Sequence, residues 1–194
     1  MTLRLTLLAH APTRAQRDAV FPQADEPAEA AGLARMADLA DRAPLWRKAA
    51  RLWTAPETRA RQTAAPLSRT LSLEAGIDPV LRDLDAGNWR GQSLSAVGAV
   101  DPAGLAAWLT DPTAEPHGGE SIARLLQRVG GWMDGLIDAE GHVVAVTHAA
   151  PIRAAVLHAL GTGADAFWRL DIVPLSLTDL RWNGRWTVRA TGVE

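Results

Sequence analysis

Cysteine and tyrosine are absent from the 194 residues, and lysine occurs once, at Lys48. Without cysteine the chain has no disulfide framework, no thiolate nucleophile and no zinc site built on sulfur. No apolar run approaches the roughly 20 residues that a membrane span requires. The apolar stretch from Leu5 to Leu8 is also shorter than the ~7–15 residues of a secretory segment. We therefore expect a cytoplasmic protein that makes no contact with a membrane.

Charge of one sign is not in excess either, because the formal net charge is -2. A nucleic-acid-binding protein would normally carry a basic stripe, whereas arginine here is mixed with Asp and Glu along the chain. This pattern predicts a small-molecule partner and no nucleic acid. A length of 194 residues favours a single domain over residues 1–194. Eight tryptophans indicate either a well-filled interior or a dimer surface, so a homodimer stays open.

Three apolar segments have the pattern of buried strands. They are Leu3 to Leu8, Arg51 to Thr54, and His142 to Thr147, and histidines follow the first and the last of them, at His10 and His148. Ligands of parallel sheets bind beyond the carboxyl ends of the strands. The two histidines are therefore placed where a ligand is expected.

Helices are predicted between and after these strands. Pro27 to Ala43 has helical composition, and Glu120 opens the strongest apolar stripe, which runs to about Glu140. Thr54 to Glu57 has the pattern of a capping box with Pro56 in the first turn. Pro151 starts a further helix that Gly161 closes. The alternation of strands and helices predicts an α/β fold with a parallel-dominated sheet covered on both faces.

Two regions have a different pattern. Asp78 to Gly104 is rich in Gly, Pro and Asp and has poor periodicity, so we expect a long excursion over the sheet. Asp171 to Arg189 has the pattern of strands joined by the hairpin signal Asn183-Gly184.

The candidate chemistry lies in motifs spread over the whole chain. The order of these motifs resembles that of the histidine phosphatase superfamily, the phosphoglycerate mutase-like proteins. The resemblance implies a three-layer α/β/α sandwich with a mostly parallel central sheet. It also implies a metal-independent phosphatase that needs no cofactor and acts on a small phosphorylated metabolite. The motifs are Leu8-Ala-His10-Ala-Pro-Thr13, Thr54-Ala-Pro-Glu-Thr-Arg59-Ala-Arg-Gln-Thr63-Ala, Leu81-Arg-Asp83-Leu-Asp-Ala-Gly87-Asn-Trp-Arg-Gly91, Gly118-Gly-Glu120-Ser and Val146-Thr-His148-Ala-Ala-Pro-Ile-Arg153.

The resemblance assigns the central roles. It makes His10 the nucleophile that takes the phosphoryl group, and a neutral imidazole suits this task because it splits one hard displacement into two steps. Arg59 would grip the phosphoryl oxygens, for which a planar bidentate donor is well shaped. Asp83 stands where the family has its proton donor, usually a glutamate, and a leaving alkoxide needs such an acid. His148 would donate a hydrogen bond to the phosphoryl group.

Further residues are assigned supporting places by the same resemblance. Thr13 and Thr147 are expected beside the phosphate, and Glu120 is expected to support the site.

The first motif departs from the family pattern, which is Arg-His-Gly. Ala9 replaces the arginine and Ala11 replaces the glycine. A transition-state donor of this kind is worth about 10²–10³ in rate, so its loss should affect turnover more than folding. Arg90, Arg14 and Arg17 are candidates for compensation. Of these we favour Arg90, which replaces an acidic residue common in the family and would bind the phosphate.

Two metal-binding interpretations are weaker, and two further histidines are expected to have no role in the site. The run Asp83-x-Asp85-x-Gly87 hints at a calcium loop, but the later ligands of that motif are missing. His142 and His148 cannot share a metal ion, because six residues of strand span about 20 Å. His117 and His158 are expected to be a loop residue and a helix-face residue.

Two functions therefore compete. The first is a phosphatase that forms phosphohistidine at His10, and the second is a catalytically degenerate relative that binds a phosphorylated ligand or a protein partner without turnover. A mutase is disfavoured, because the family's mutases carry longer insertions. Trp89 and Trp108 in the excursion either stack on a ligand or serve as core or lid residues.

Overall fold

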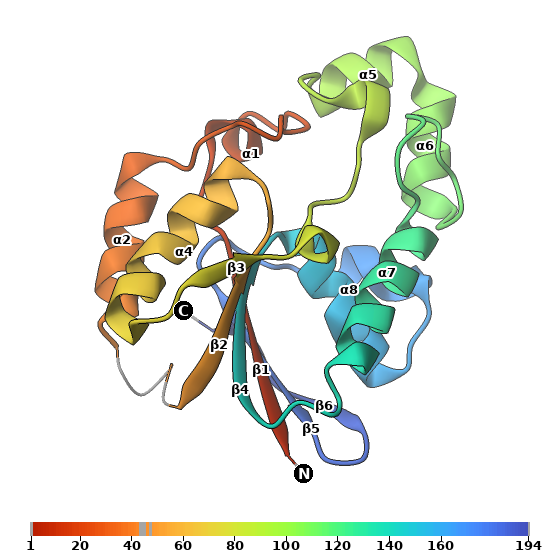
Figure 1. The fold of residues 1–194 in the computed structure, drawn as a ribbon. Helices are drawn as coiled ribbons and strands as arrows, with labels where there is room; N and C mark the ends of the chain where they lie inside the picture. The colour runs from red at the N-terminus through yellow and green to blue at the C-terminus, as the bar shows by residue number, and fades with distance from the viewer. Residues whose placement is uncertain (1, 43–45, 47, 194) are drawn as a thin grey trace.

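The computed structural model describes residues 2–42, 46 and 48–193 and has an α/β fold. A six-stranded sheet in the order β3-β2-β4-β1-β5-β6 forms the centre of this described part (Figure 1). β1 to β4 pair in parallel, whereas β5 runs antiparallel to both β1 and β6. The strands are β1 (Leu3–Ala9), β2 (Ala49–Thr54), β3 (Ala75–Ile77), β4 (Gly141–Thr147), β5 (Leu177–Trp182) and β6 (Trp186–Val193).

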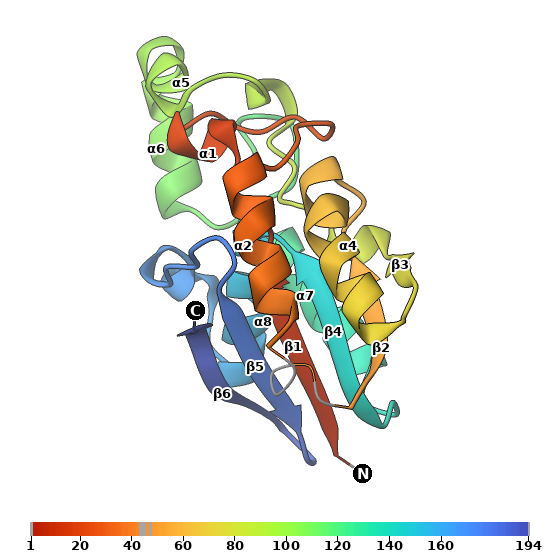
Figure 2. The same ribbon diagram turned by 90° about the vertical axis from the view of Figure 1, so that its left-hand side faces the viewer.

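Helices cover both faces of the sheet, as the sequence predicts. α2 (Ala30–Ala40) and α4 (Thr58–Leu71) lie on one face, and α7 (Ile122–Gly135) and α8 (Ala149–Leu160) lie on the other (Figures 1 and 2). The core fills the two interfaces with apolar side chains from β1 and β4, both almost completely buried, and from the inner faces of these helices. Burial of this kind is the main stabilising contribution to the fold. Within the described residues, no helix has the length and apolarity needed to cross a bilayer.

A cap formed by residues 78–120 stands over the carboxyl ends of the parallel strands (Figure 1). It has a small apolar cluster of its own, separate from the main core, in which Trp89 and Trp108 pack with Phe21 from the other end of the chain. Its short elements are η1 (Pro79–Leu81), η2 (Gly87–Trp89), α5 (Leu94–Val100) and α6 (Pro102–Thr110). α1 (Arg14–Arg17) and η3 (Ala164–Arg169) lie outside it.

Several predicted boundaries need correction. The helix expected over Pro27 to Ala43 begins at Ala30 and ends at Ala40, while Ala43 lies outside the described residues. The capping box expected at Thr54 to Glu57 was wrong: Glu57 is the N-cap, and its side chain makes no capping hydrogen bond. That side chain contacts His148 instead.

Other predictions hold with small shifts. The stripe expected to open at Glu120 becomes α7, capped by Ser121, and Pro151 lies in the first turn of α8 rather than at its start. Gly161 closes α8 with a left-handed backbone (φ 63°), which glycine adopts without steric cost. The hairpin at Asn183-Gly184 joins β5 and β6.

The sequence failed most clearly between residues 71 and 111. The three residues of β3 had no recognisable strand pattern, and the excursion from Asp78 to Gly104 contains α5 and the start of α6. Asp101 ends α5 and caps α6 by accepting a hydrogen bond from Gly104 N. Side chains such as aspartate act through local backbone hydrogen bonds of this kind.

Candidate active site

The strand register brings His10 and His148 together. β1 and β4 are parallel neighbours in which Ala9 is level with Thr147, so the residue after each strand emerges at the same edge of the sheet. The backbone N–H of His10 donates to Thr147 O at 2.9 Å. The two imidazole rings meet edge to face with their centroids 4.9 Å apart, and both are buried. The convergence predicted from the sequence is therefore present.

The His10 ring is held as a neutral imidazole with one free nitrogen. Burial, together with the charges of His148 and Arg59, lowers the pKa of His10 from 6.5 to about 3. Nδ1 lies 2.7 Å from Ala11 O, and because a carbonyl oxygen only accepts, Nδ1 must carry the proton. This tautomer leaves the lone pair on Nε2. The geometry thus provides a nitrogen nucleophile near neutral pH.

Glu57 orients the second histidine. Its Oε2 lies 2.8 Å from His148 Nε2, and its Oε1 accepts a hydrogen bond from Asp83 N at 3.1 Å. Burial raises the pKa of Glu57, but the hydrogen bond and charge of His148 outweigh burial and hold that pKa below its ordinary range. An ionised carboxylate only accepts, so His148 Nε2 donates to it. Nδ1 of His148 is buried and has no hydrogen-bond partner in the described part of the chain.

Arg59 and Asp83 face each other across the same space. Arg59 enters from the first turn of α4, is almost completely buried, and donates from Nη2 to Asp83 Oδ2 at 2.9 Å and from Nη1 to Gln23 O at 2.9 Å. Its Nε is buried without a hydrogen-bond partner among the described residues. Asp83 Oδ2 also lies 3.4 Å from His148 Nδ1. The carboxylate of Asp83 therefore bridges Arg59 and His148 as an internal anion.

Two opposing effects act on this carboxylate. Burial raises the pKa of Asp83, but the charges of His148 and Arg59 outweigh it and keep the pKa below its ordinary range. An opposite charge within about 4–6 Å has this effect in general. The charges that favour ionised Asp83 are the ones that would favour a phosphoryl group in its place.

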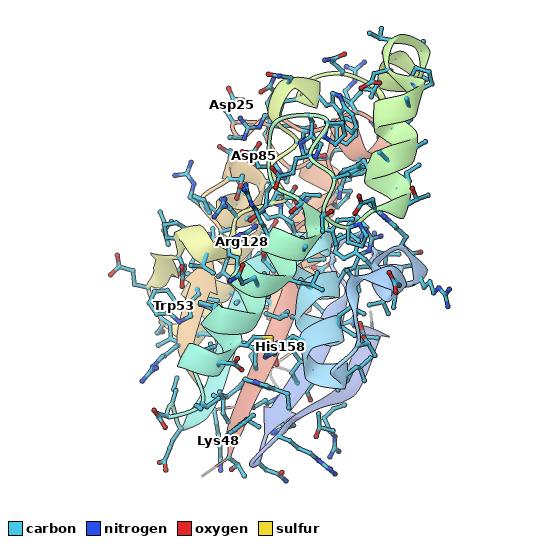
Figure 3. The ribbon with its side chains drawn as sticks, turned by 90° about the vertical axis from the view of Figure 1, so that its right-hand side faces the viewer. Asp25, Lys48, Trp53, Asp85, Arg128 and His158 are labelled. Carbon is cyan, nitrogen blue, oxygen red and sulfur yellow. The ribbon has the colours of Figure 1, made fainter. Side chains whose placement is uncertain are left out.

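Glu120 and Arg128 hold the segment that carries Asp83. Arg128 on α7 binds both carboxylate oxygens of Glu120 and donates to the backbone carbonyls of Val80, Arg82 and Asp83. Figure 3 shows Arg128 on α7 and Asp85, a residue of the cap, beyond the end of that helix. Glu120, predicted to support the site, does not line the cavity and contacts the Asp83 segment through Arg128.

Close backbone packing explains the glycines of two motifs. Gly87 has a left-handed backbone (φ 48°), and a Cβ at this position would lie 2.0 Å from His117 O. A Cβ on Gly119 would lie 2.0 Å from Asp85 O. Asn88 N and Glu120 N donate across the same contact, to His117 O and Asp85 O. A side chain at either glycine would therefore displace the loop that carries Asp83.

A cavity of about 300 Å³ opens over these groups. Its floor contains His10, His148, Arg59, Asp83 and Glu57. Aromatic side chains and further arginines form its walls, and the cap lies over it. The wall includes Gln16, Phe21, Arg82, Arg90, Trp108, Arg153, Phe167 and Trp168.

Thr13 and Thr147, which the sequence placed beside the phosphate, lie behind the wall of the cavity and do not line it. Thr13 caps α1 by accepting a hydrogen bond from Gln16 N, and the hydroxyl of Thr147 donates to Leu81 O at 2.6 Å. Both threonines are fully buried, and neither is among the described residues that line the cavity. Their hydroxyl groups form hydrogen bonds with backbone groups. The sequence does not reveal these bonds, because the two threonines lie after and within buried strands.

The candidates for replacing the missing arginine are differently placed. Arg90 lines the cavity at its rim and is paired with Asp85 at 2.5 Å, with about half of its side chain exposed. Arg14 and Arg17 point away to the surface, where they pair with Asp18 and Glu29.

Ala9 belongs to the main core and is 3% exposed. Its backbone N–H and C=O pair with Ser176 and Leu175. Methyl groups at Ala9 and Ala11 are thus packed among apolar neighbours on either side of His10. Within the described residues, Arg59 is the only arginine that reaches the floor with a fully buried guanidinium.

Sequence reasoning missed two groups. Glu57 was assigned to a helix cap, although it lies two residues before Arg59 in the same motif and could have been tested as an orienting carboxylate. Arg153 ends the motif around His148, five residues beyond it on α8, and was given no role. Trp108 lines the cavity as well as packing in the cap, whereas Trp89 packs in the cap cluster.

The remaining histidines do not enter the site. His117 lies in a loop of the cap and accepts from Gly119 N, and His158 on α8 pairs with Asp134 at 2.8 Å, as the sequence predicted in outline. His142 bonds to the Thr6 hydroxyl at 2.8 Å at the other end of β4. The described residues contain no group of three or more histidines and carboxylates arranged to hold a metal ion.

These features agree with the comparison with known proteins, in which residues 5–193 match the histidine phosphatase superfamily (branch 1). The chain therefore belongs to the histidine phosphatase superfamily. The bifunctional protein Rv2228c of Mycobacterium tuberculosis is 34% identical over 140 residues, which is 70% of this chain and 38% of that protein. The chain thus spans less than half the length of this relative. Phosphoserine phosphatase 1 of Hydrogenobacter thermophilus is 28% identical over 60% of this chain and 57% of its own.

Solved structures confirm the fold. The mycobacterial glucosyl-3-phosphoglycerate phosphatase Rv2419c, solved with VO3, has a TM-score of 0.87 and 24% identity, covering 98% of this chain and 99% of its own. A structure named mycobacterial hydrolase 1 has a TM-score of 0.90 and 24% identity over the whole of both chains. At this level of identity the likeness concerns the fold.

Proposed function

We propose that this protein is a phosphoric monoester hydrolase that acts on a small phosphorylated metabolite through a phosphohistidine at His10. The observation that carries the proposal is the His10 ring, with its proton held on Nδ1 by Ala11 O and its free Nε2 beside Arg59 and His148. The proposed reaction uses side chains of this chain and water alone.

Binding begins with exchange of anions. The phosphoryl group of the substrate takes the place of the Asp83 carboxylate between Arg59 and His148, and Asp83 turns toward the ester oxygen. The unpartnered Arg59 Nε and, when His148 is protonated, its Nδ1 then donate to phosphoryl oxygens. Donors held in place before the reaction stabilise the charge that develops in the transition state.

Transfer then proceeds in two displacements. His10 Nε2 forms a bond to phosphorus, the ester P–O bond breaks, and Asp83, protonated beside the incoming dianion, gives its proton to the leaving oxygen. In the second step water attacks the phosphohistidine while the Asp83 carboxylate takes one of its protons. Phosphate leaves, and the Nε2 lone pair is restored.

A second candidate rests on Ala9. Because a core methyl group stands where the family has an arginine, the described residues place a single buried guanidinium at the floor, and that guanidinium already binds Asp83. A protein of this kind would bind a phosphorylated ligand through Arg59 without turning it over. Phosphate or vanadate bound in the cavity would still stabilise the folded chain against unfolding.

Hydrolysis of a chromogenic aryl phosphate separates the two candidates. The wild-type chain is expected to release the chromophore, and His10→Ala is expected to lose at least about 10³-fold of that rate. His158→Gln is the matched control, since His158 lies outside the cavity and should leave the rate unchanged. Equal rates for wild type and His10→Ala, or release by neither, would contradict the phosphatase and favour the second candidate.

A further inference from the structure

Arg153 reaches the cavity wall from α8. It follows His148 by five residues and lines the same cavity. Its Nε donates to Leu170 O at 2.7 Å, and its guanidinium carbon lies 5.6 Å from the ring centre of Phe167 and 5.7 Å from that of Trp168. The carbonyl and the two rings therefore hold the guanidinium in one place.

The charge of Arg153 differs from the charges of the other cavity arginines. Arg59 pairs with Asp83, Arg82 with Glu120, and Arg90 with Asp85. Arg153 differs from these three arginines, because it makes no ion pair in the described part of the chain. Its terminal nitrogens have no hydrogen-bond partner there either.

This unpaired charge is costly where it lies. Burial lowers the pKa of Arg153, while the charges of Asp171 and Asp83 act in the opposite direction without cancelling that effect. Arginine stays protonated at any ordinary pH, so the charge cannot be removed by titration. A partly buried guanidinium whose terminal N–H groups have no protein partner is a suitable binding group for an anion from outside the chain.

Aromatic side chains continue from Arg153 along the wall. The ring centroid of Trp168 lies 4.9 Å from that of Phe167 and 4.7 Å from that of Trp108. The ring centroids of Trp108 and Phe21 lie 5.7 Å apart. These four residues come from three separate segments and all line the cavity. Trp168 remains 39% exposed, which leaves an apolar ring open to solvent at the cavity. Such a surface favours a flat apolar group over water.

We propose that Arg153 and these four aromatic residues form a leaving-group subsite, which selects phosphomonoesters whose leaving group joins a flat apolar body to a second anion. The inference rests on the proposed function, because it places the phosphoryl group of that substrate on Arg59 and the histidines. The second anion is a carboxylate or a further phosphate, both of which a guanidinium binds through two parallel hydrogen bonds.

Binding of matched phosphonates tests the subsite without turnover. The probes are 3- and 4-carboxybenzylphosphonate, their neutral carboxamide counterparts, and the corresponding bisphosphonates, measured by titration calorimetry on the wild-type chain. The carboxylates or the bisphosphonates are expected to bind at least about tenfold more tightly than the carboxamides. The stronger of the two charged series identifies the anion. Equal affinity of charged and neutral probes, or no binding of either, would overturn the subsite.

A variant pair locates the effect. Arg153→Gln should abolish the preference for the charged probe while changing the affinity of the carboxamide less than about threefold. Arg82→Gln is the matched control, because Arg82 lines the same cavity but is paired with Glu120, and it should keep the preference. If Arg153→Gln weakens the charged and neutral probes equally, Arg153 binds the phosphonate itself and the proposal is wrong. The wild-type comparison stands even if Arg153→Gln does not fold.

The outcome is separable from the phosphatase proposal. If the chain hydrolyses aryl phosphates but shows no preference between the probes, the reaction survives and the subsite does not. If the preference is present but no hydrolysis depends on His10, the subsite belongs to a binding protein and the reaction is wrong.

Discussion

The floor of the cavity and the cap above it are built in different ways. The floor lies at the ends of β1 and β4, where parallel register and nearly complete burial fix His10 and His148. The cap packs around a small cluster of its own, with Trp89 and Trp108 at its centre. The floor therefore has little freedom to change without loss of the sheet, whereas the cap can change its lining while the strands stay in place. The proposed nucleophile lies in the first region and the proposed proton donor, Asp83, in the second, whereas the proposed leaving-group subsite joins Trp108 of the cap to residues outside it.

Among the variants that compare catalysis at the floor and the cap, Arg59→Gln is expected to have the largest effect. We expect kcat on an aryl phosphate to fall by about 10²–10³-fold, because Arg59 is the fully buried guanidinium of the floor. Steady-state kinetics with a chromogenic substrate measure this effect. Arg61→Gln, on the exposed side of the same helix, is the control and should retain the wild-type rate. A loss confined to KM would show that Arg59 contributes only to binding.

Asp83→Asn tests the proton donor through its dependence on the leaving group. For esters of poorly acidic alcohols we expect a fall in kcat of about 100-fold, because the leaving oxygen then lacks its proton. For a nitrophenyl ester, whose leaving group needs no proton, the fall should be much smaller. The measurement is kcat over a series of esters with graded leaving groups. An equal fall across the series would contradict the acid role of Asp83.

The pH dependence of stability compares a histidine of the floor with one of the cap. The pKa of His10 is about 3 in the folded chain and 6.5 in the unfolded chain, so the unfolded chain binds more protons between these values. The contribution of neutral His10 to the free energy of unfolding is therefore fully present above about pH 6.5. It is lost as the pH falls, by about 2 kcal/mol at pH 5. Urea unfolding at the two pH values should show this loss in wild type and a much smaller one in His10→Asn.

His117 provides the matched variant in the cap. Burial lowers the pKa of His117, while the charges of Asp85 and Glu115 oppose that effect. The sign of its contribution is the same as that of His10, and we expect His117→Asn to remove a smaller part of the pH dependence. A larger effect from His117 than from His10 would reverse the proposed contrast between floor and cap.

Trp108→Ala should have the smallest kinetic effect and should act on KM. An aromatic contact contributes about 0.5–1.5 kcal/mol beyond area, so KM for an aromatic ester should rise about two- to tenfold with kcat nearly unchanged. Amide hydrogen exchange should show faster opening of residues 78–120 while β1 and β4 keep their protection. Faster exchange in the sheet as well would show that cap and floor fold as one cooperative unit.

The same contrast explains how much the sequence could reveal. Leu3 to Leu8 and His142 to Thr147 are buried on both faces, so they have continuous apolar patterns that place His10 and His148 at the strand ends. Glu57 was misassigned because a carboxylate before a helix has the pattern of a cap, and only its three-dimensional position beside His148 shows otherwise. The cap helices were missed because their apolar residues face a small local cluster rather than the main core.

Isolation of the covalent intermediate tests the central claim most directly. A rapid acid-free quench during turnover of a labelled phosphomonoester, followed by peptide mapping, should find the phosphoryl group on His10 as an acid-labile, base-stable adduct. The adduct should be absent from His10→Ala and present in His158→Gln. Turnover without any labelled protein, or with the label on His148 or another residue, would contradict the account.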